Sequence, residues 1–214
     1  MSKPIIMFDM DGTLLDLSYD NFLWNNHIPL CYAQQHQLPL EVAHQYLNEL
    51  YVQYRHTLFW YSTQFWSEKL ELDIMQIHHH FAHKIKLRSG CLTLLSELKD
   101  KGYECWLVTN ADLKNLSLKL ELTPLRPYFK HIISSESLKY PKEDPLFWTK
   151  LHHLYPFCKS KSVFIDDTHQ VLKTAQNFGL NKLFTITQPS SEDLPNHQSH
   201  FPVLHHLTDL MLHL

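Results

Sequence analysis

The stretch "IIMFDMDGTLLD" (residues 5–16) sets a short apolar run directly before two aspartates, Asp9 and Asp11, that lie two positions apart. Residues two apart fall on the same side of a strand, so the two carboxylates are expected close together at the end of a buried strand. Like charges repel there, and burying either one is costly unless something compensates. A polar strand end entering a turn at Gly12 would explain the pattern. A site that holds a cation and an anionic ligand would explain why both carboxylates are present.

The composition indicates a globular protein. The chain has 214 residues, 44% of them hydrophobic and 19% charged, which suits one medium domain or a core with a smaller insert. A formal charge of −3 provides no basic field for nucleic acid. No segment approaches the roughly 20 apolar residues of a membrane span, and the N-terminal apolar run is too short for a signal peptide. Four cysteines without a CxxC pair indicate reduced thiols, so we expect a cytoplasmic protein.

The chain contains 17 histidines, and the run "HHHFAH" (78–83) sets His79 and His83 four apart on an expected helix. That spacing can bind a transition metal. No cysteine or acidic residue stands at ligand spacing, so a solvated polar helix face is the simpler explanation.

Residues 17–86 read as helical throughout. The apolar positions Leu47, Leu50, Tyr51, Tyr54 and Leu58 recur at helical spacing, which predicts an amphipathic helix near 41–58. The aromatic-rich stretch 58–72 and the stretch 74–85 have the same period.

The rest of the chain alternates between strands and helices, which predicts an α/β fold whose parallel sheet is covered on both faces. Strands are expected within 5–8, 103–109, 131–135, 162–167 and, as the last strand, 182–186; helices are expected within 89–102, 111–122, 145–155 and 169–180. Ser89 is a candidate N-cap, and Gly102 and Gly179 are candidate helix ends. We therefore predict an α/β core of residues 1–16 and 87–214 with a helical insert of residues 17–86. The tail 189–214 is expected to end in a short helix.

Polar residues gather where the predicted strands end, the edge at which parallel sheets bind ligands. They are Asp9, Asp11, Thr109, Asn110, Lys139, Lys142, Asp166 and Asp167. Each pair alone has an ordinary explanation, such as a turn or a helix N-cap. Together they suit phosphoryl transfer. Clustered carboxylates bind Mg²⁺, one aspartate can attack phosphorus, and a second can move the proton of the leaving oxygen. The hydroxyl, amide and lysine can hold the phosphate and its developing charge.

Four stretches resemble the motifs of the haloacid dehalogenase-like hydrolase superfamily. They are "DMDGTLLD" (9–16), "LVTN" (107–110), "YPKEDPLFW" (140–148) and "FIDD" (164–167). The resemblance implies a Rossmann-like core with a C1-type helical cap at 17–86 that closes over the site. It implies Asp9 as the nucleophile and Asp11 as the general acid and base, with Thr109, Asn110 and Lys142 binding phosphate and Lys142 also catalytic.

The same resemblance implies a Mg²⁺ site. The ligands would be the Asp9 side chain, the Asp11 backbone carbonyl and Asp167, with Asp166 beside the metal, directly or through water. Two positions depart from the family pattern. Glu143 follows Lys142 where proline is common, which leaves Lys139 as an alternative lysine, and Val171 stands where many members carry another acid.

The second aspartate, Asp11, favours a phosphomonoester phosphatase over a dehalogenase, because a leaving alkoxide needs an acid. A phosphotransferase is the lesser alternative. The stretches 15–29, 53–74 and 140–144 resemble the GMP/IMP-specific 5′-nucleotidases of the superfamily. We therefore predict a Mg²⁺-dependent 5′-nucleotidase, monomeric or homodimeric, acting on GMP and IMP through an aspartyl-phosphate. The alternatives are a phosphatase of another small ester, such as a sugar phosphate or phosphoglycolate, and a phospho-ligand-binding protein without turnover.

The aromatic residues of the predicted cap have two possible roles. Trp60, Tyr61 and Arg55 can stack on or hydrogen-bond a purine base. Alternatively, Trp60 forms the hydrophobic core of the cap together with Phe65 and Trp66.

Overall fold

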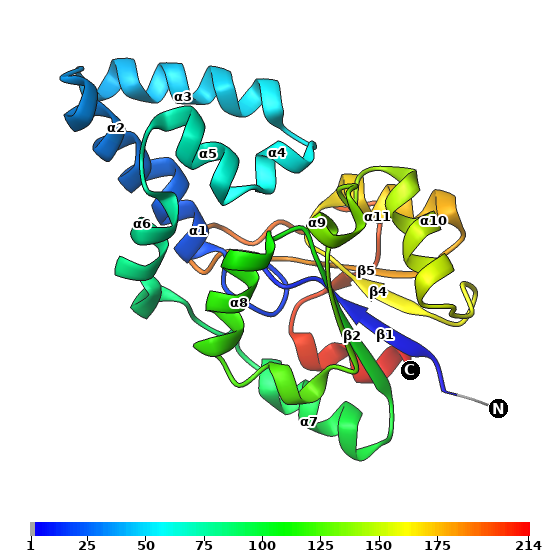
Figure 1. Cartoon of the computed structure of the whole chain (residues 1–214). Coiled ribbons are helices and arrows are strands. Elements are labelled where there is room, and N and C mark those ends of the chain that lie inside the picture. Colours follow the sequence, from blue (N-terminus) through cyan, green and yellow to red (C-terminus); the bar gives the residue numbers. More distant parts are fainter. Residues whose placement is uncertain (1–2) are drawn as a thin grey trace.

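The centre of the computed structural model, which describes residues 3–214, is a six-stranded parallel sheet with the order β3-β2-β1-β4-β5-β6 (Figure 1). The strands are β1 (Ile5–Phe8), β2 (Glu104–Thr109), β3 (His131–Ser134), β4 (Val163–Ile165), β5 (Lys182–Ile186) and β6 (Val203–Leu204). The α/β prediction is confirmed for this part of the chain; residues 1 and 2 of the predicted core lie outside the described residues. Lys182–Ile186 is not the last strand, because Val203 pairs with Thr185 and extends the sheet.

Alternation along the strands divides the core into two hydrophobic layers. In β1, Ile6 and Phe8 face one layer and Met7 faces the other. In β2, Leu107 and Trp106 divide in the same way. Strands buried on both faces need such continuous apolar runs, which explains why the strands could be located from sequence.

Helices cover both faces of the sheet (Figure 1). The first layer contains α7 (Cys91–Asp100), α8 (Leu113–Glu121) and the 3₁₀ helix η4 (Leu207–His213), with the 3₁₀ turn η3 (Arg126–Tyr128) between α8 and β3. The second contains α9 (Ser135–Leu138), α10 (Pro145–Leu154) and α11 (His169–Phe178). The C-terminal η4 confirms the short helix expected at the end of the tail.

Between β1 and α7 the chain forms an all-helical insert with its own hydrophobic cluster, which includes Leu47, Trp66 and Ile74. Its elements are α1 (Ser18–Phe22), the π-helix η1 (Leu23–His27), α2 (Ile28–His36), α3 (Leu40–Tyr54), α4 (Leu58–Tyr61), α5 (Thr63–Leu70), α6 (Ile74–His80) and the 3₁₀ turn η2 (Ala82–Lys84). The all-helical insert is confirmed, whereas the boundaries 17–86 stay a prediction.

The insert leaves and rejoins the core at one place. The backbone N–H of Asp16 donates to the carbonyl of Lys86 at 2.9 Å, and the N–H of Arg88 donates to the carbonyl of Leu14 at 2.9 Å. The Asp16 carboxylate also accepts hydrogen bonds from the backbone N–H groups of Ser18 and Ser191. The two connections therefore run side by side and are tied to the core.

Several local expectations are corrected. The stretch 58–72 is two helices, because the Ser62 hydroxyl accepts a hydrogen bond from the N–H of Phe65 and starts α5 anew. Helix α7 starts from Gly90, whose φ of 77° is left-handed, and not from Ser89. Helix α6 ends at His80, so His83 does not share a helix with His79.

The four cysteines are free thiols, as expected. Among the helices of residues 3–214, none combines the length and the apolar character that crossing a membrane requires.

Candidate active site

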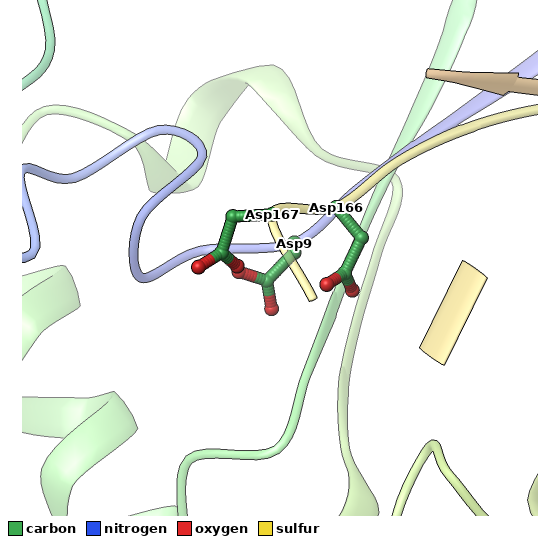
Figure 2. Close-up of side chains that lie close together, drawn as sticks. All are labelled: Asp9, Asp166 and Asp167. Atoms are coloured by element: carbon green, nitrogen blue, oxygen red, sulfur yellow. The ribbon is translucent and has the colours of Figure 1, made fainter. Parts of the chain in front are cut away.

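Three aspartates form the floor of the site (Figure 2). Asp9 follows β1, and Asp166 and Asp167 follow β4, the neighbouring parallel strand, so the strand ends bring them together. Each offers one carboxylate oxygen, and these oxygens lie within 4.8 Å of one another. Asp9 and Asp166 are buried, and Asp167 is partly exposed.

Lys142 lies between two of these carboxylates. Its Nζ donates to Asp9 Oδ1 at 2.5 Å and to Asp166 Oδ2 at 2.7 Å, and its side chain is 2% exposed. The indole N–H of Trp148 donates to the Lys142 carbonyl at 2.9 Å and fixes the backbone. The alternative, Lys139, is exposed and lies at the end of α9. Lys142 is therefore the lysine that the fold brings to the aspartates.

Asp11 lies beside the cluster and points one oxygen at a different lysine. Lys119 Nζ of α8 donates to Asp11 Oδ1 at 2.7 Å and to both carboxylate oxygens of Asp20 at 2.9 Å. Lys119 is buried, and the sequence reasoning missed it. Its position beside Leu116 and Leu120 on the apolar side of α8 was the available signal.

Thr109 is the last residue of β2, next to Asp9, and Asn110 follows it; both line the cavity of the site. The Asn110 side chain is already engaged at both ends. Its Oδ1 accepts from the Lys142 backbone N–H at 2.9 Å, and its Nδ2 donates to Glu143 Oε2 at 2.9 Å. Asn110 therefore ties the end of β2 to the loop that carries Lys142. Thr109 Oγ1 accepts from the Ala111 N–H at 3.0 Å.

Gly12 is required by its surroundings. Its φ is +83°, and a Cβ at this position would lie 2.6 Å from Asp167 Oδ2. Any larger residue would have to displace the carboxylate, so the position of Asp167 depends on a glycine at position 12.

A cavity of about 470 Å³ opens above the aspartates. Its core side includes Asp9, Asp11, Thr109, Lys142 and Asp167, and its insert side includes Trp24, Tyr51, Arg55, Trp60, Tyr61 and Trp66. Trp60 also packs in the insert cluster, so it belongs both to the cavity wall and to the hydrophobic core. Phe65 lies in that cluster and does not line the cavity.

Glu143 belongs to the core, and its side chain contacts two residues of the insert. Its Oε1 accepts a hydrogen bond from the Tyr61 hydroxyl at 2.5 Å and lies 3.3 Å from His56 Nδ1. His56 has a left-handed φ of 64°, in the turn between α3 and α4. The residue that departs from the motif pattern thus joins the two parts of the cavity wall.

Comparison with known proteins identifies the family of this chain. The family model of haloacid dehalogenase-like hydrolases matches residues 6–185, which spans all four motifs. The chain belongs to the haloacid dehalogenase-like hydrolase family. It is an enzyme of the phosphatase type within that family.

One relative is the GMP/IMP nucleotidase YrfG of Escherichia coli, 34% identical over 87% of this chain and 84% of the relative. A more distant one is the pyrophosphatase PpaX of Bacillus cereus, 23% identical over 84% of this chain and 81% of the relative. Among solved structures, a HAD phosphatase from Thermococcus onnurineus has a TM-score of 0.81 at 20% identity, covering 99% of this chain and 97% of that one. The hydrolase YfnB of Bacillus subtilis, described as bound to magnesium, has a TM-score of 0.68 at 19% identity over 99% and 98% of the two chains.

In this member of the family, burial and the Lys142 ammonium shift the pKa values of two floor aspartates in opposite directions. Burial raises the pKa of Asp9 well above its ordinary value, although the Lys142 ammonium lowers it. Burial raises the pKa of Asp166 as well, again against Lys142. For Lys142, burial lowers the pKa, but Asp166 and Asp9 raise it by more, so the amine stays protonated at neutral pH.

The pKa values of the two other aspartates, Asp11 and Asp167, are also raised. Burial raises the pKa of Asp11 to about 6, although Lys119 opposes the shift. Burial, together with the nearby Asp166 carboxylate, raises the pKa of Asp167 to about 7. In both residues burial is the largest cause, and it outweighs the nearby ammonium groups, Lys119 for Asp11 and Lys142 for Asp167.

The residues present fit a divalent cation. Three carboxylate oxygens within 4.8 Å form a hard-oxygen donor set, which Mg²⁺ prefers. Among the described residues none donates a side-chain hydrogen bond to the Asp167 carboxylate. A cation there would offset the repulsion that burial makes costly.

Proposed function

We propose that this enzyme is a Mg²⁺-dependent 5′-nucleotidase that hydrolyses GMP and IMP. The observation that carries the proposal is a single cavity whose floor holds Asp9, Asp11 and Lys142 and whose insert wall holds aromatic rings, including Trp24 and Trp60. A phosphate suits the floor, and a planar purine suits the aromatic wall. The similarity to a GMP/IMP nucleotidase supports this choice of base.

In the first half of the reaction, we assign Asp9 as the nucleophile. A carboxylate oxygen of Asp9 forms a bond to phosphorus, and the ester P–O bond breaks. The electron pair leaves with the nucleoside 5′-oxygen, which takes a proton from Asp11. A pKa near 6 suits a group that must give up a proton and take one back near neutral pH.

The second half reverses the role of Asp11. Asp11 removes a proton from a water molecule as the water oxygen attacks the phosphorus of the aspartyl-phosphate. The bond between phosphorus and the Asp9 oxygen breaks, which restores the Asp9 carboxylate and releases inorganic phosphate. One aspartate thus serves as acid and then as base.

The remaining floor residues bind and neutralise charge. We assign the Thr109 hydroxyl and Asn110 to the phosphate oxygens, with Asn110 acting through its backbone because its side chain is engaged by Lys142 and Glu143. Lys142 provides the fixed positive charge. Asp9, the Asp11 carbonyl and Asp167 would hold Mg²⁺, with Asp166 beside it, and Mg²⁺ would draw negative charge from the phosphate.

We infer that the helical insert, residues 17–86, acts as the cap of the core formed by residues 1–16 and 87–214. Closing such a cap excludes bulk water from the site and controls entry. The contact of Tyr61 with Glu143 supports this role, since it joins the insert to the core above the aspartates. We expect the enzyme to work in the cytoplasm, as a monomer or a homodimer.

The test is phosphate release from a panel of phosphomonoesters, with Mg²⁺ and with a chelator. The panel holds GMP, IMP, AMP, pyrimidine monophosphates, sugar phosphates and phosphoglycolate. Chelator-sensitive turnover confined to GMP and IMP is expected. Turnover of other esters instead would keep the chemistry and discard the purine assignment. Asp9→Asn is expected to abolish turnover while the protein stays folded, and unchanged phosphate release by that variant would overturn the mechanism.

A further inference from the structure

Lys119 is a buried cation outside the four motifs. Its side chain is 1% exposed, although α8 belongs to the layer that covers the sheet. A buried ammonium has lost its hydration, so it remains charged only with close anionic partners. Lys119 has two such partners, Asp11 of the core and Asp20 of the insert helix α1. The ring of Tyr19, with its centroid 5.5 Å from Nζ, covers another side of the ammonium.

This arrangement distinguishes the two oxygens of Asp11. Lys119 holds Oδ1 at 2.7 Å, whereas no residue in the range 3–214 forms a hydrogen bond with Oδ2. Asp11 lines the cavity, so Oδ2 is the oxygen that remains for a bound ester. A carboxylic acid transfers its proton from one oxygen, and holding the other oxygen fixes the direction of transfer.

We propose that Lys119 is a positioning residue that orients Asp11 for proton transfer to the leaving oxygen, with Asp20 holding Lys119 from the insert side. The proposal rests on the proposed function, in which Asp11 is the general acid. As the ester P–O bond breaks, the proton passes from Asp11 Oδ2 to the leaving oxygen, which receives the electron pair of that bond. Asp11 is then an anion, and the Lys119 ammonium at Oδ1 stabilises that charge as it forms.

The role of Asp20 follows from the geometry. Both of its oxygens lie 2.9 Å from Nζ, so it approaches Lys119 symmetrically and fixes the ammonium opposite Asp11. Asp20 is also part of the cavity wall. The insert therefore contributes to proton transfer through an ion pair in addition to covering the site.

The test uses two matched substrates, phenyl phosphate and 4-nitrophenyl phosphate. They have similar shapes, but nitrophenolate is a much better leaving group and needs less help from an acid. Single-turnover release of the phenol is measured with enzyme in excess and Mg²⁺ present, so that only the first half of the reaction is observed. The variants are Lys119→Met and the double variant Lys119→Met/Asp20→Asn, which removes the opposing charge in case the single variant does not fold. Lys114→Met, an exposed position on the same helix, is the control.

For Lys119→Met, or for the double variant, we expect release from phenyl phosphate to slow by about tenfold or more, as for loss of general-acid assistance. Release from 4-nitrophenyl phosphate is expected to change by no more than about twofold, because that reaction does not depend on the acid. Lys114→Met is expected to match the unaltered enzyme on both substrates. An equal loss on the two substrates, or no loss on either, would overturn the proposal.

The benchmark variant Asp11→Asn separates this proposal from the proposed function. It is expected to show the same selective loss on phenyl phosphate. If Asp11→Asn slows both substrates equally, the assignment of Asp11 as the acid is wrong and the proposal for Lys119 falls with it. If Asp11→Asn is selective and the Lys119 variants are not, only the positioning role is wrong. The aryl phosphates carry no purine, so they test only the chemistry at the floor; absence of phosphate release from both of them and from GMP and IMP would overturn the proposed function itself.

Discussion

The Tyr61 hydroxyl donates a hydrogen bond to Glu143 Oε1 at 2.5 Å, so a side chain of the insert is bound to a buried carboxylate of the core. The other Glu143 oxygen accepts from Asn110, which in turn accepts from the backbone N–H of Lys142. One chain of hydrogen bonds thus runs from the insert helix α4 to the loop that carries Lys142.

Tyr61→Phe is expected to weaken this link and to lower kcat/KM for the preferred ester by about tenfold. The lost hydrogen bond has a charged acceptor, and such bonds contribute about 1.5–3 kcal/mol. Steady-state kinetics at saturating Mg²⁺ measures the effect. Tyr155→Phe is the matched control, since Tyr155 packs against the second core layer, away from the cavity. Equal kinetics for Tyr61→Phe and the unaltered enzyme would show that this link does not contribute to turnover.

Gly12→Ala is expected to reduce both stability and activity. A Cβ would lie 2.6 Å from Asp167 Oδ2 and would also strain a residue with a φ of +83°. Gly102→Ala separates the two effects, because Gly102 has a φ of +69° but its nearest neighbour would be 3.9 Å away. Both variants are expected to lose about 1 kcal/mol of unfolding free energy from backbone strain. Only Gly12→Ala is expected to lose most of its phosphate release, and equal activities in the two variants would contradict the contact with Asp167.

Asp167→Asn is expected to raise the melting temperature of the metal-free protein and to lower the stabilisation by Mg²⁺. The substitution removes one of three close carboxylates, and like charges that are buried together destabilise the fold. A ligand that binds only the folded state stabilises it, and the stabilisation grows with the logarithm of its affinity. Thermal melts with chelator and with Mg²⁺ measure both quantities. The exposed position Asp100→Asn is the control, and an unchanged Mg²⁺ effect in Asp167→Asn would contradict the proposed ligand set.

His78 is expected to make the fold less stable in mild acid. Burial lowers the pKa of His78 to about 3, whereas an unfolded histidine has a pKa of about 6.5. Because the unfolded state binds the proton more readily, this contribution is complete above about pH 6.5 and is lost as the pH falls from there toward 3. Between pH 7 and pH 5 the loss is about 2 kcal/mol of unfolding free energy.

Urea unfolding at pH 7 and pH 5 tests the histidine directly. Between pH 7 and pH 5, the unfolding free energy of His78→Phe is expected to fall by about 2 kcal/mol less than that of the unaltered protein. His79→Phe, an exposed neighbour on the same helix, is expected to keep the full dependence. The same pH dependence in His78→Phe and the unaltered protein would contradict the role of His78.

The parts of the fold that follow from local chemistry could be predicted from the sequence. The strands of the core are apolar on both faces. Because β1 and β4 are neighbouring parallel strands, their ends bring Asp9 together with Asp166 and Asp167. Helix ends that depend on one side chain were less predictable. Ser62 divides an apparently continuous helix, and nothing in the helical period indicates that its hydroxyl caps α5.

Residues whose surroundings come from distant segments could not be assigned a role. The helical period places Lys119 on the apolar side of α8, but its role depends on α1, which brings Asp20 and Tyr19 against it. Glu143 was recognised as a departure from the family pattern, but its contact with Tyr61 depends on how the insert folds over the core. Strand β6 is two residues long, too short for a pattern.

The side-by-side connections at Leu14–Arg88 and Asp16–Lys86 have an evolutionary consequence. Because the chain departs and returns at adjacent points, the α/β framework would close over a short splice if the helical segment were removed. Replacing the segment would change the insert side of the cavity together with the contacts of Asp20 and Tyr61, whereas Asp9, Lys142, Asp166 and Asp167 all belong to the framework. One contiguous piece of gene therefore encodes the whole insert side of the cavity, so we expect its exchange to alter ester preference while the aspartates after β1 and β4 stay in place.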